Sequence, residues 1–303
     1  HRHALLLPAG KLGRRMVHAV GQPHRLERAP SARQPLRPPQ TGVQHLTYDN
    51  YTSPAVHKVG SGDAWGTLRA VRFRNRPAHA DQLHVELWWR GNNIARDAGT
   101  YSYNMPYPWQ NALDRTRVHN TITVNETDQM VRVSRFLWLD QAQAKLEGAR
   151  GERVIQASHN GYRRAGIRHQ RSLAYHAGTG FTIVDTLTRR KNGDDIDYCL
   201  HWLLPDWAWQ LTGQSLILSH RDFSMRIEIT GRGTEGNTPL APVDVSLIRG
   251  GESLAGQRQD MILGWESDTY GEKHPGLSYS LRFTAAASIE LTTKWTVDES
   301  TRQ

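Results

Sequence analysis

Apolar and polar residues alternate along most of the chain from about Gly60 onward. The clearest case is the segment DQLHVELWWRG at 81–91. One face of it would hold the apolar positions Leu83, Val85, Leu87 and Trp89, and the other face His84, Glu86, Trp88 and Arg90. A period of two is the pattern of a half-buried β-strand. The segment therefore predicts a strand with its apolar face against a core.

The same alternation recurs between short turn-like stretches. It predicts further strands over 67–74, 119–125, 130–139, 171–176, 181–187, 197–204, 215–220, 224–230, 243–248, 277–283 and 288–293. Asn192-Gly193 predicts a type I′ hairpin between two of these strands, 181–187 and 197–204. No amphipathic helix exceeds about three turns, and no repeat has a fixed period. We predict an all-β fold, one large antiparallel β-sandwich of the supersandwich type over 60–303.

Residues 1–59 differ from this pattern. They are rich in proline and arginine, and 1–45 contain no Phe, Trp or Tyr. Such a segment buries too little apolar surface to offset its ordering entropy, so we predict disorder, with room for one short helix around 10–20. A truncated or frame-shifted gene start would have the same composition. No secretory signal is visible, and no run approaches the length of a membrane span, so we expect no membrane partner.

Charge and cysteine content narrow the functional classes. The net charge is +9, but residues 1–40 contribute +7 of it, so the remainder is nearly balanced. The high isoelectric point is therefore no evidence for a polyanionic ligand, and no nucleic-acid motif is present. The single cysteine, Cys199, excludes an internal disulfide and a cysteine zinc cluster. Its place in an alternating strand predicts a buried thiol.

Three spaced residues between Arg76 and Met130 form the first candidate site. His79 precedes the 81–91 strand, Asp97 follows the next short apolar stretch, and His119 begins another strand. In an antiparallel meander such strand ends can converge, and two imidazoles with one carboxylate suit Zn²⁺. The alternative is that each histidine caps a strand or packs at an edge. His84 and His201 alternate with apolar residues, which predicts satisfied sheet histidines.

A second metal hypothesis uses His79 with Asp81. The order His-Ala-Asp with a distant histidine matches the facial triad of non-haem iron oxygenases, which also occur on β-sandwiches. The third ligand would be His119, His169 or His176. A three-residue match is a weak signal, and the sequence offers no clear late-strand arginine for a keto-acid cosubstrate.

Aromatic and basic residues near these positions suit a sugar ligand. The turn GTYSYNMPYPWQN at 99–111 carries Tyr103, Tyr107 and Trp109, and tyrosine can serve as acid and base where positive charge lowers its pKa. Aromatic rings also stack on sugar rings. Four arginines cluster in 159–176, and we expect Arg163 and Arg164, with Arg76, to contact an acidic sugar. The alternatives are a packed sandwich edge and a solvated hairpin.

Several stretches together resemble one known family. They are HAD at 79–81, the strand up to Trp89, DAGTYSYN at 97–104, HNTITV at 119–124, DQM at 128–130 and GWESDTYGEKHPGLSYSL at 264–281. In this order and spacing they resemble the C-terminal domain of the heparinase II/III-like family. That family contains polysaccharide lyases, including alginate lyases and heparin or heparan lyases. The resemblance covers nearly all of the chain predicted to be ordered.

The resemblance implies a zinc-binding β-sandwich packed against an N-terminal α/α toroid, with the catalytic cleft between them. By position it implies that His79, Asp97 and His119 bind zinc and that Asp81 orients a ligand or the turn. It implies β-elimination on a uronate polymer: the carboxylate is neutralised, a base takes the C5 proton and an acid protonates the leaving C4 oxygen. It also implies a periplasmic or secreted protein.

Two departures from the family pattern limit the expected activity. The toroid, which carries an Asn/His and a Tyr of the family's machinery, has no room in residues 1–59, and a further family histidine is replaced by Pro77. We therefore expect the zinc-bearing sandwich of a uronate-polysaccharide lyase with little or no activity alone, to which Tyr107, or failing it Tyr103, contributes a catalytic phenol. The alternative is a non-catalytic carbohydrate-binding or scaffold module with structural zinc. The sequence does not choose among alginate, heparan and other uronate polymers.

Overall fold

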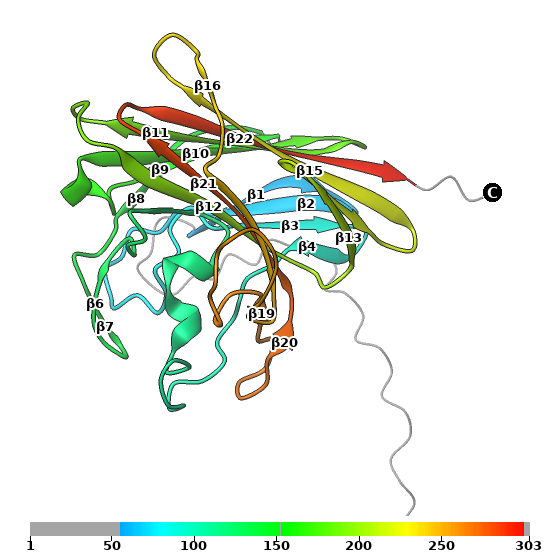
Figure 1. Cartoon of the computed structure of the whole chain (residues 1–303), viewed down its shortest axis with the longest axis horizontal. Coiled ribbons are helices and arrows are strands. Elements are labelled where there is room, and N and C mark those ends of the chain that lie inside the picture. The colour runs from blue at the N-terminus through cyan, green and yellow to red at the C-terminus, as the bar shows by residue number, and fades with distance from the viewer. Residues whose placement is uncertain (1–54, 152, 300–303) are drawn as a thin grey trace, which may run out of the picture. The chain divides into compact units, whose positions relative to one another are not determined.

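The computed structural model of the protein describes residues 55–151 and 153–299, and these form an antiparallel all-β fold (Figure 1). The prediction of a β-sandwich is thereby confirmed. The first strand, β1, begins at Val56, slightly ahead of the boundary predicted at 60. The predicted disorder of 1–59 is therefore wrong for residues 56–59, which belong to β1. Residues 1–54, with the short helix predicted around 10–20, lie outside the described residues.

A large sheet of nine strands forms one layer of the sandwich. Its order is β13-β14-β15-β22-β11-β10-β9-β8, and β16 pairs with β15. The strands are β8 (Ala144–Arg150), β9 (Val154–His159), β10 (Ile167–His176), β11 (Gly180–Arg189), β13 (Ala208–Thr212), β14 (Ser215–Ser219), β15 (Phe223–Gly233), β16 (Pro239–Leu240) and β22 (Ile289–Glu299). Its long central strands alternate buried and partly exposed positions, as the sequence pattern predicts.

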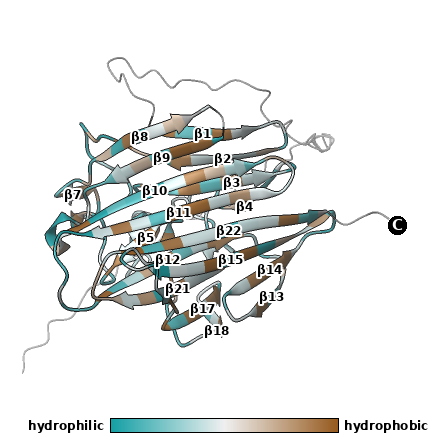
Figure 2. Ribbon diagram, turned by 90° about the horizontal axis from the view of Figure 1, so that it is seen from above, coloured by the Kyte–Doolittle hydropathy of each residue, from teal (hydrophilic) through white to brown (hydrophobic). Residues whose placement is uncertain are grey.

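Two smaller sheets lie beneath it (Figures 1 and 2). One has the order β1-β2-β3-β4, and the other β18-β17-β21-β12-β5. Their strands are β1 (Val56–Ser61), β2 (Ala64–Arg69), β3 (Val85–Trp89), β4 (Asn92–Ala95), β5 (Ile122–Val124), β12 (Ile196–Leu204), β17 (Asp244–Arg249), β18 (Glu252–Ala255) and β21 (Leu277–Ala285). The Arg96 N–H, just after β4, donates to the Leu203 carbonyl of β12 at 2.8 Å. We call the junction of these two sheets the seam.

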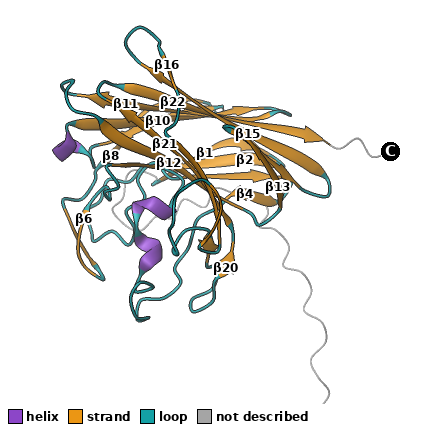
Figure 3. Ribbon diagram, in the orientation of Figure 1, coloured by secondary structure: helices purple, strands orange, loops and turns teal. Residues whose placement is uncertain are grey.

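Two hairpins and three single-turn 3₁₀ helices complete the described structure. The hairpins are β6 (Val131–Ser134) with β7 (Leu137–Leu139) and β19 (Trp265–Glu266) with β20 (His274–Pro275); the helices, purple in Figure 3, are η1 (Ala112–Asp114), η2 (Thr116–Val118) and η3 (Arg163–Ala165). Among the described residues no helix is long and apolar enough to cross a membrane.

Aromatic and aliphatic side chains from all three sheets form one core. Trp202 of β12 meets Trp295 of β22 edge to face at 5.2 Å between ring centroids. Trp89 of β3 meets Phe181 of β11 in the same way at 6.3 Å. Because these rings belong to facing sheets, they join the two layers through apolar burial. Cys199 is buried, as predicted.

Two predicted elements differ from the structure. Residues 130–139 form a two-stranded hairpin, β6 and β7, instead of one strand, and its apolar residues Val133, Phe136 and Leu139 are exposed. Asn192-Gly193 does not close a hairpin, because β11 and β12 belong to different sheets. The chain there crosses between layers, and the Gly193 N–H donates to Ala286 of the β21–β22 turn. Neither residue has a positive φ, which a type I′ turn requires.

Candidate functional site

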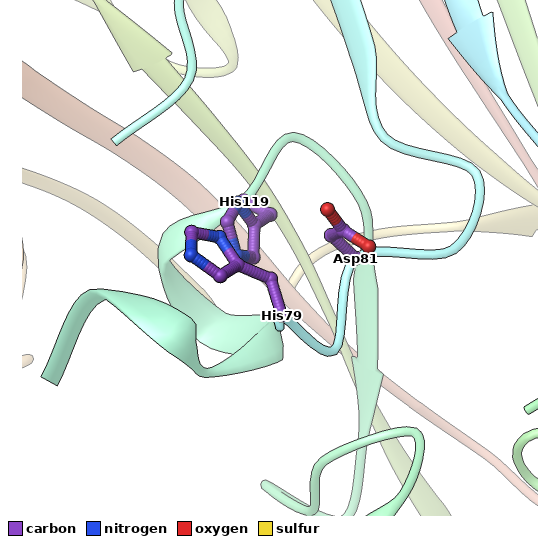
Figure 4. A group of neighbouring side chains, drawn as sticks. All are labelled: His79, Asp81 and His119. Atoms are coloured by element: carbon purple, nitrogen blue, oxygen red, sulfur yellow. The ribbon is translucent and has the colours of Figure 1, made fainter. Parts of the chain in front are cut away.

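The structure brings His79, Asp97 and His119 to one place at the seam. His79 lies in the loop before β3, Asp97 just after β4, and His119 between η2 and β5. His119 Nδ1 lies 3.1 Å from Asp97 Oδ2, and the His79 and His119 ring centroids are 5.2 Å apart. Figure 4 shows these two rings side by side. His79 and Asp97 thus both adjoin His119, and the binding of a metal by these three residues stays a prediction.

His84 belongs to the same group, contrary to its prediction as a satisfied sheet histidine. It is buried one residue before β3, and its Nε2 lies 3.5 Å from Asp97 Oδ2. His79, His84, Asp97 and His119 are called the seam cluster below. His201, by contrast, is satisfied as predicted: its ring nitrogens lie 3.0 Å from the His119 carbonyl and 2.6 Å from Ser278 Oγ.

Hydrogen bonds fix the proton positions on two of these rings. The Asn120 N–H donates to His84 Nδ1 at 3.0 Å, so the neutral His84 ring carries its proton on Nε2. His84 can then donate toward Asp97, but it cannot bind a metal through Nε2. His119 directs Nδ1 at Asp97, which leaves Nε2. Among the described residues this buried Nε2 has no hydrogen-bond partner, so the His119 ring is only partly satisfied.

The electrostatics of the cluster differ from residue to residue. Burial lowers the pKa of His84 to about 4 and also lowers the pKa of His79. For His119, burial alone would lower the pKa, but the Asp97 carboxylate and its hydrogen bond outweigh burial and raise it. Burial alone would raise the pKa of Asp97, yet the charge and hydrogen bond of His119, helped by His84 and His79, hold it well below its usual range. Asp97 is therefore an anion among imidazoles.

Asp81 is a second carboxylate within reach. Candidate ligand atoms of His79, Asp81 and His119 lie within 4.8 Å of one another (Figure 4), as do those of His84, Asp97 and His119. Asp81 differs from Asp97 because its Oδ1 accepts a hydrogen bond from Arg69 Nε at 2.8 Å. A guanidinium thus already balances Asp81, while the charged partners of Asp97 are imidazoles.

The loop that carries Asp97 is held by the late segment 264–273. The Ser267 N–H donates to the Ala98 carbonyl at 2.9 Å, and the Gly271 N–H donates to Tyr101 at 2.7 Å. Gly99 has a φ of 70°, and a Cβ there would lie 2.1 Å from the Ser267 carbonyl oxygen. Only glycine permits this close approach. Two segments singled out in the sequence thus lie against each other and fix the position of Asp97.

A cavity of about 280 Å³ opens beside His79. It is lined by Arg76, Pro77, Ala78, His79, Tyr103, Asn111 and Phe136. Tyr103 packs against Phe136 and Tyr270, with ring centroids 5.1 and 5.4 Å away. The candidate residues Arg76, His79 and Tyr103 therefore share one concave surface that has an aromatic wall.

The other candidate tyrosine, Tyr107, is 94% exposed and does not line this cavity. Tyr270, which sequence reasoning missed, accepts a hydrogen bond from the Tyr103 N–H at 3.1 Å. Hydrogen bonds from Ser102 and from the Tyr103 main chain, with the Arg135 charge, lower the pKa of Tyr270. Its place in the 264–281 segment was the available signal.

Trp109 lies in a separate aromatic group. Its ring meets Tyr101 and Trp265 edge to face at 5.5 and 5.8 Å, and Lys273 Nζ lies 4.3 Å from its centroid. The same ammonium is 3.0 Å from the Trp265 ring centroid. Trp109 therefore helps to enclose Lys273 and does not line the cavity beside His79.

The predicted basic patch of 159–176 divides into two parts. Arg163 and Arg164, on η3, both pair with Asp140, and Arg168 pairs with Glu147. Arg171, His159 and His169 are buried instead, because they occupy inward positions of β9 and β10. The exposed arginines are thus balanced by acids. Their role in binding a sugar stays a prediction.

The sequence of this chain matches a known family of proteins. The described part of the chain is an antiparallel β-sandwich domain with a histidine–carboxylate cluster where loops of one layer meet. The model of the family "Heparinase II/III-like, C-terminal" matches residues 69–301, so the chain belongs to this family. No curated protein matches it.

Solved structures of several lyases have the same fold. A heparinase III has 19% identical residues and a TM-score of 0.58, over 81% of this chain and 35% of that one. The heparan sulfate lyase HepC from Pedobacter heparinus has 16% identity and a TM-score of 0.57, over 79% and 34%. A further heparinase III has 14% identity and a TM-score of 0.58, over 78% and 34%. This chain thus spans about a third of the length of these proteins.

Proposed function

We propose that the protein is the zinc-bearing sandwich of a polysaccharide lyase that acts on a uronate-containing polymer by β-elimination. Family membership supports the lyase class, and the seam cluster supports the metal. The single observation that carries the proposal is the Asp97 carboxylate held among imidazoles, with His119 Nδ1 only 3.1 Å from its Oδ2. Two atoms at this separation can bind the same zinc ion.

His79, Asp97 and His119 are the residues that we propose hold zinc. Asp97 is favoured over Asp81 because Arg69 already balances Asp81. Three protein ligands leave the fourth zinc position to water or another ligand, and the ion would tie the loop before β3 to the chain around β4 and β5. Asp81 and His84 would orient the ligating groups by hydrogen bonding.

The cavity beside His79 is the part of this surface that suits a sugar chain. Arg76 offers positive charge to a uronate carboxylate, and Tyr103 offers a phenol within the same cavity. Among the two tyrosines predicted as catalytic, its place in the cavity favours Tyr103 over Tyr107. Proton removal at C5 needs a base beside the sugar, and position 77 holds a proline that has no such group. We therefore propose that a second domain, the α/α toroid, completes the cleft.

Metal analysis of the full 303-residue chain tests the metal assignment. After incubation with zinc and gel filtration, the wild type and the surface variant His176→Ala should retain about one zinc per chain. His119→Ala should retain almost none. Equal zinc content in wild type and His119→Ala would remove His119 from the site.

Binding and lyase assays on the same samples test the substrate class. Heparan sulfate and alginate should bind to the Tyr103→Ala variant more weakly than to the wild type. With the wild-type chain alone, the unsaturated uronate product should form slowly or not at all. Rapid lyase activity of the chain alone would contradict the need for a second domain. Full zinc content without affinity for any acidic polysaccharide would favour a scaffold module with structural zinc.

A further inference from the structure

Arg171 is a fully buried cation that lies on the inner face of the nine-stranded sheet. It occupies β10 directly opposite Asp185 of β11, and both side chains have no exposed surface. Arg171 Nε donates to Asp185 Oδ1 at 2.6 Å, and Nη2 donates to Oδ2 at 2.9 Å. This bidentate pair places the guanidinium in one fixed orientation.

The third guanidinium nitrogen of Arg171, Nη1, reaches across the core to the seam. Nη1 donates to the Leu83 carbonyl at 2.7 Å and to the Asn120 carbonyl at 2.5 Å. Leu83 immediately precedes His84, and Asn120 immediately follows His119. One side chain from the opposite layer therefore holds the main chain next to two members of the seam cluster.

Leu83 has a conformation that needs such support. Its φ is 59°, in the left-handed region that a leucine rarely adopts outside strained positions. The Leu83 N–H donates to Arg69, and its carbonyl accepts from Arg171. Backbone strain of this kind persists where surrounding contacts over-determine it, and it often lies at functional sites.

Asn120 links the main chain held by Arg171 to the ring of His84. Its N–H is the group that donates to His84 Nδ1, while its side-chain amide donates to Val85 and to Arg96 and accepts from the Leu203 N–H. Asn120 therefore connects β3, the end of β4 and β12. A shift of its carbonyl would move both the seam and the hydrogen bond that fixes the His84 tautomer.

Two buried histidines complete the support behind Asp185. The Gly161 N–H donates to His159 Nδ1, so His159 Nε2–H donates to His169 Nδ1 at 3.0 Å. His169 Nε2–H then donates to Asp185 Oδ1 at 2.6 Å. His159, His169, Arg171 and Asp185 are called the core cluster. None of its polar atoms is among the buried ones that lack a partner in the described chain.

We propose that Arg171, backed by the core cluster, is a positioning residue for the seam cluster. It sets the main-chain positions from which His84 and His119 face Asp97, an inference that rests on the proposed metal site. A lysine cannot replace it, because one ammonium cannot match both oxygens of Asp185 and two carbonyls in the geometry of the planar guanidinium.

Amide exchange and zinc affinity of the full chain test this role. In the metal-free protein, Arg171→Lys should raise hydrogen exchange of the Asn120 amide, relative to amides of β17, about tenfold or more. Zinc affinity, measured against a competing chelator, should fall by about tenfold or more, as for lost partners that orient metal ligands. Ile227→Ala, at a fully buried position of the sheet that contains Arg171, should change each quantity by no more than about twofold.

The double variant Arg171→Met/Asp185→Leu guards against misfolding, since it leaves no unpaired buried charge. It should show the same changes as Arg171→Lys. Unchanged Asn120 exchange in both Arg171 variants would overturn the proposal, as would equal effects in Ile227→Ala. If the wild type binds no zinc, the metal assignment fails, and the exchange rates still decide whether Arg171 positions His84.

Discussion

The seam cluster and the core cluster use the same residue types in opposite ways. Each contains histidines and one aspartate. The core cluster lies on the adjacent strands β9, β10 and β11, and the seam cluster lies where the two smaller sheets meet. In the core cluster every hydrogen bond has a determined direction, from Gly161 through His159 and His169 to Asp185. In the seam cluster, Nε2 of both His84 and His119 lacks a hydrogen-bond partner among the described residues.

This difference separates a satisfied polar network from one that is only partly satisfied. A buried polar network is stabilising when all its members are satisfied, and a partly satisfied one is costly. The core cluster meets the first condition and therefore needs no ligand. The seam cluster retains an anion, Asp97, among imidazoles that are only partly satisfied, so its cost is recovered if a metal binds. Histidine and aspartate content alone would not distinguish the two.

Removing the anion of the core cluster should have the largest effect. Asp185→Asn leaves the fully buried Arg171 without a counterion, so the free energy of unfolding should fall by about 3–5 kcal/mol. Urea unfolding of the full chain measures it. The control Asp140→Asn removes a carboxylate that pairs with Arg163 and Arg164 at the surface, and it should cost less than about 1 kcal/mol. A similar loss in both variants would show that burial does not distinguish these pairs.

The two carboxylates near His119 should differ in their effect on metal affinity. Asp97→Asn should weaken zinc binding more than about 100-fold, or roughly 3 kcal/mol, because it removes a ligand. Asp81→Asn should weaken it by about 10- to 100-fold, because it removes a group that orients ligands. Chelator competition at fixed pH measures both. The reverse order would assign the metal to His79, Asp81 and His119, whose candidate ligand atoms also lie within 4.8 Å of one another.

Much of the fold follows from the alternation of residue types, but the sheet assignments do not. Strands such as β12 and β21 are visible because their inward positions are apolar over nine residues. The connection at Asn192-Gly193 has a hairpin sequence and yet joins two layers. Local turn preference contributes little against the burial of Tyr198, Leu200 and Trp202 between the sheets. The chain between 130 and 139 alternates like a core strand and is instead a hairpin that buries Trp138 and exposes Val133, Phe136 and Leu139.

The candidate site shows the same limit. Spacing and residue type identified His79, Asp97 and His119, because loops between paired strands return to one edge. His84 was missed, since its sequence position matches a sheet residue and its role depends on the Asn120 N–H. Arg171 and Asp185 did leave a signal: each replaces an apolar residue at an inward position, in IRHQRSL and FTIVDTL. Their pairing needed the strand register.

Acid should lower the free energy of unfolding through the core cluster, by a smaller amount that grows as the pH falls. Burial, with the charges of His169 and Arg171, holds the pKa of His159 well below its usual value of 6.5. The folded chain then keeps His159 neutral while the unfolded chain binds a proton below about pH 6.5. Stability is therefore full above that pH and falls as the pH decreases toward the folded pKa, by up to about 1.4 kcal/mol per pH unit for one proton.

The variant His159→Gln should reduce this slope by up to that amount, measured by urea unfolding at a series of pH values below 6.5. The matched variant His176→Gln, at an exposed histidine that hydrogen-bonds Thr182, should leave the slope unchanged. Because His169 remains buried in the His159 variant, part of the acid sensitivity should persist. An unchanged slope in His159→Gln would mean that the folded chain protonates His159 as readily as the unfolded chain. The hydrogen bonds of the core cluster would then not keep His159 neutral.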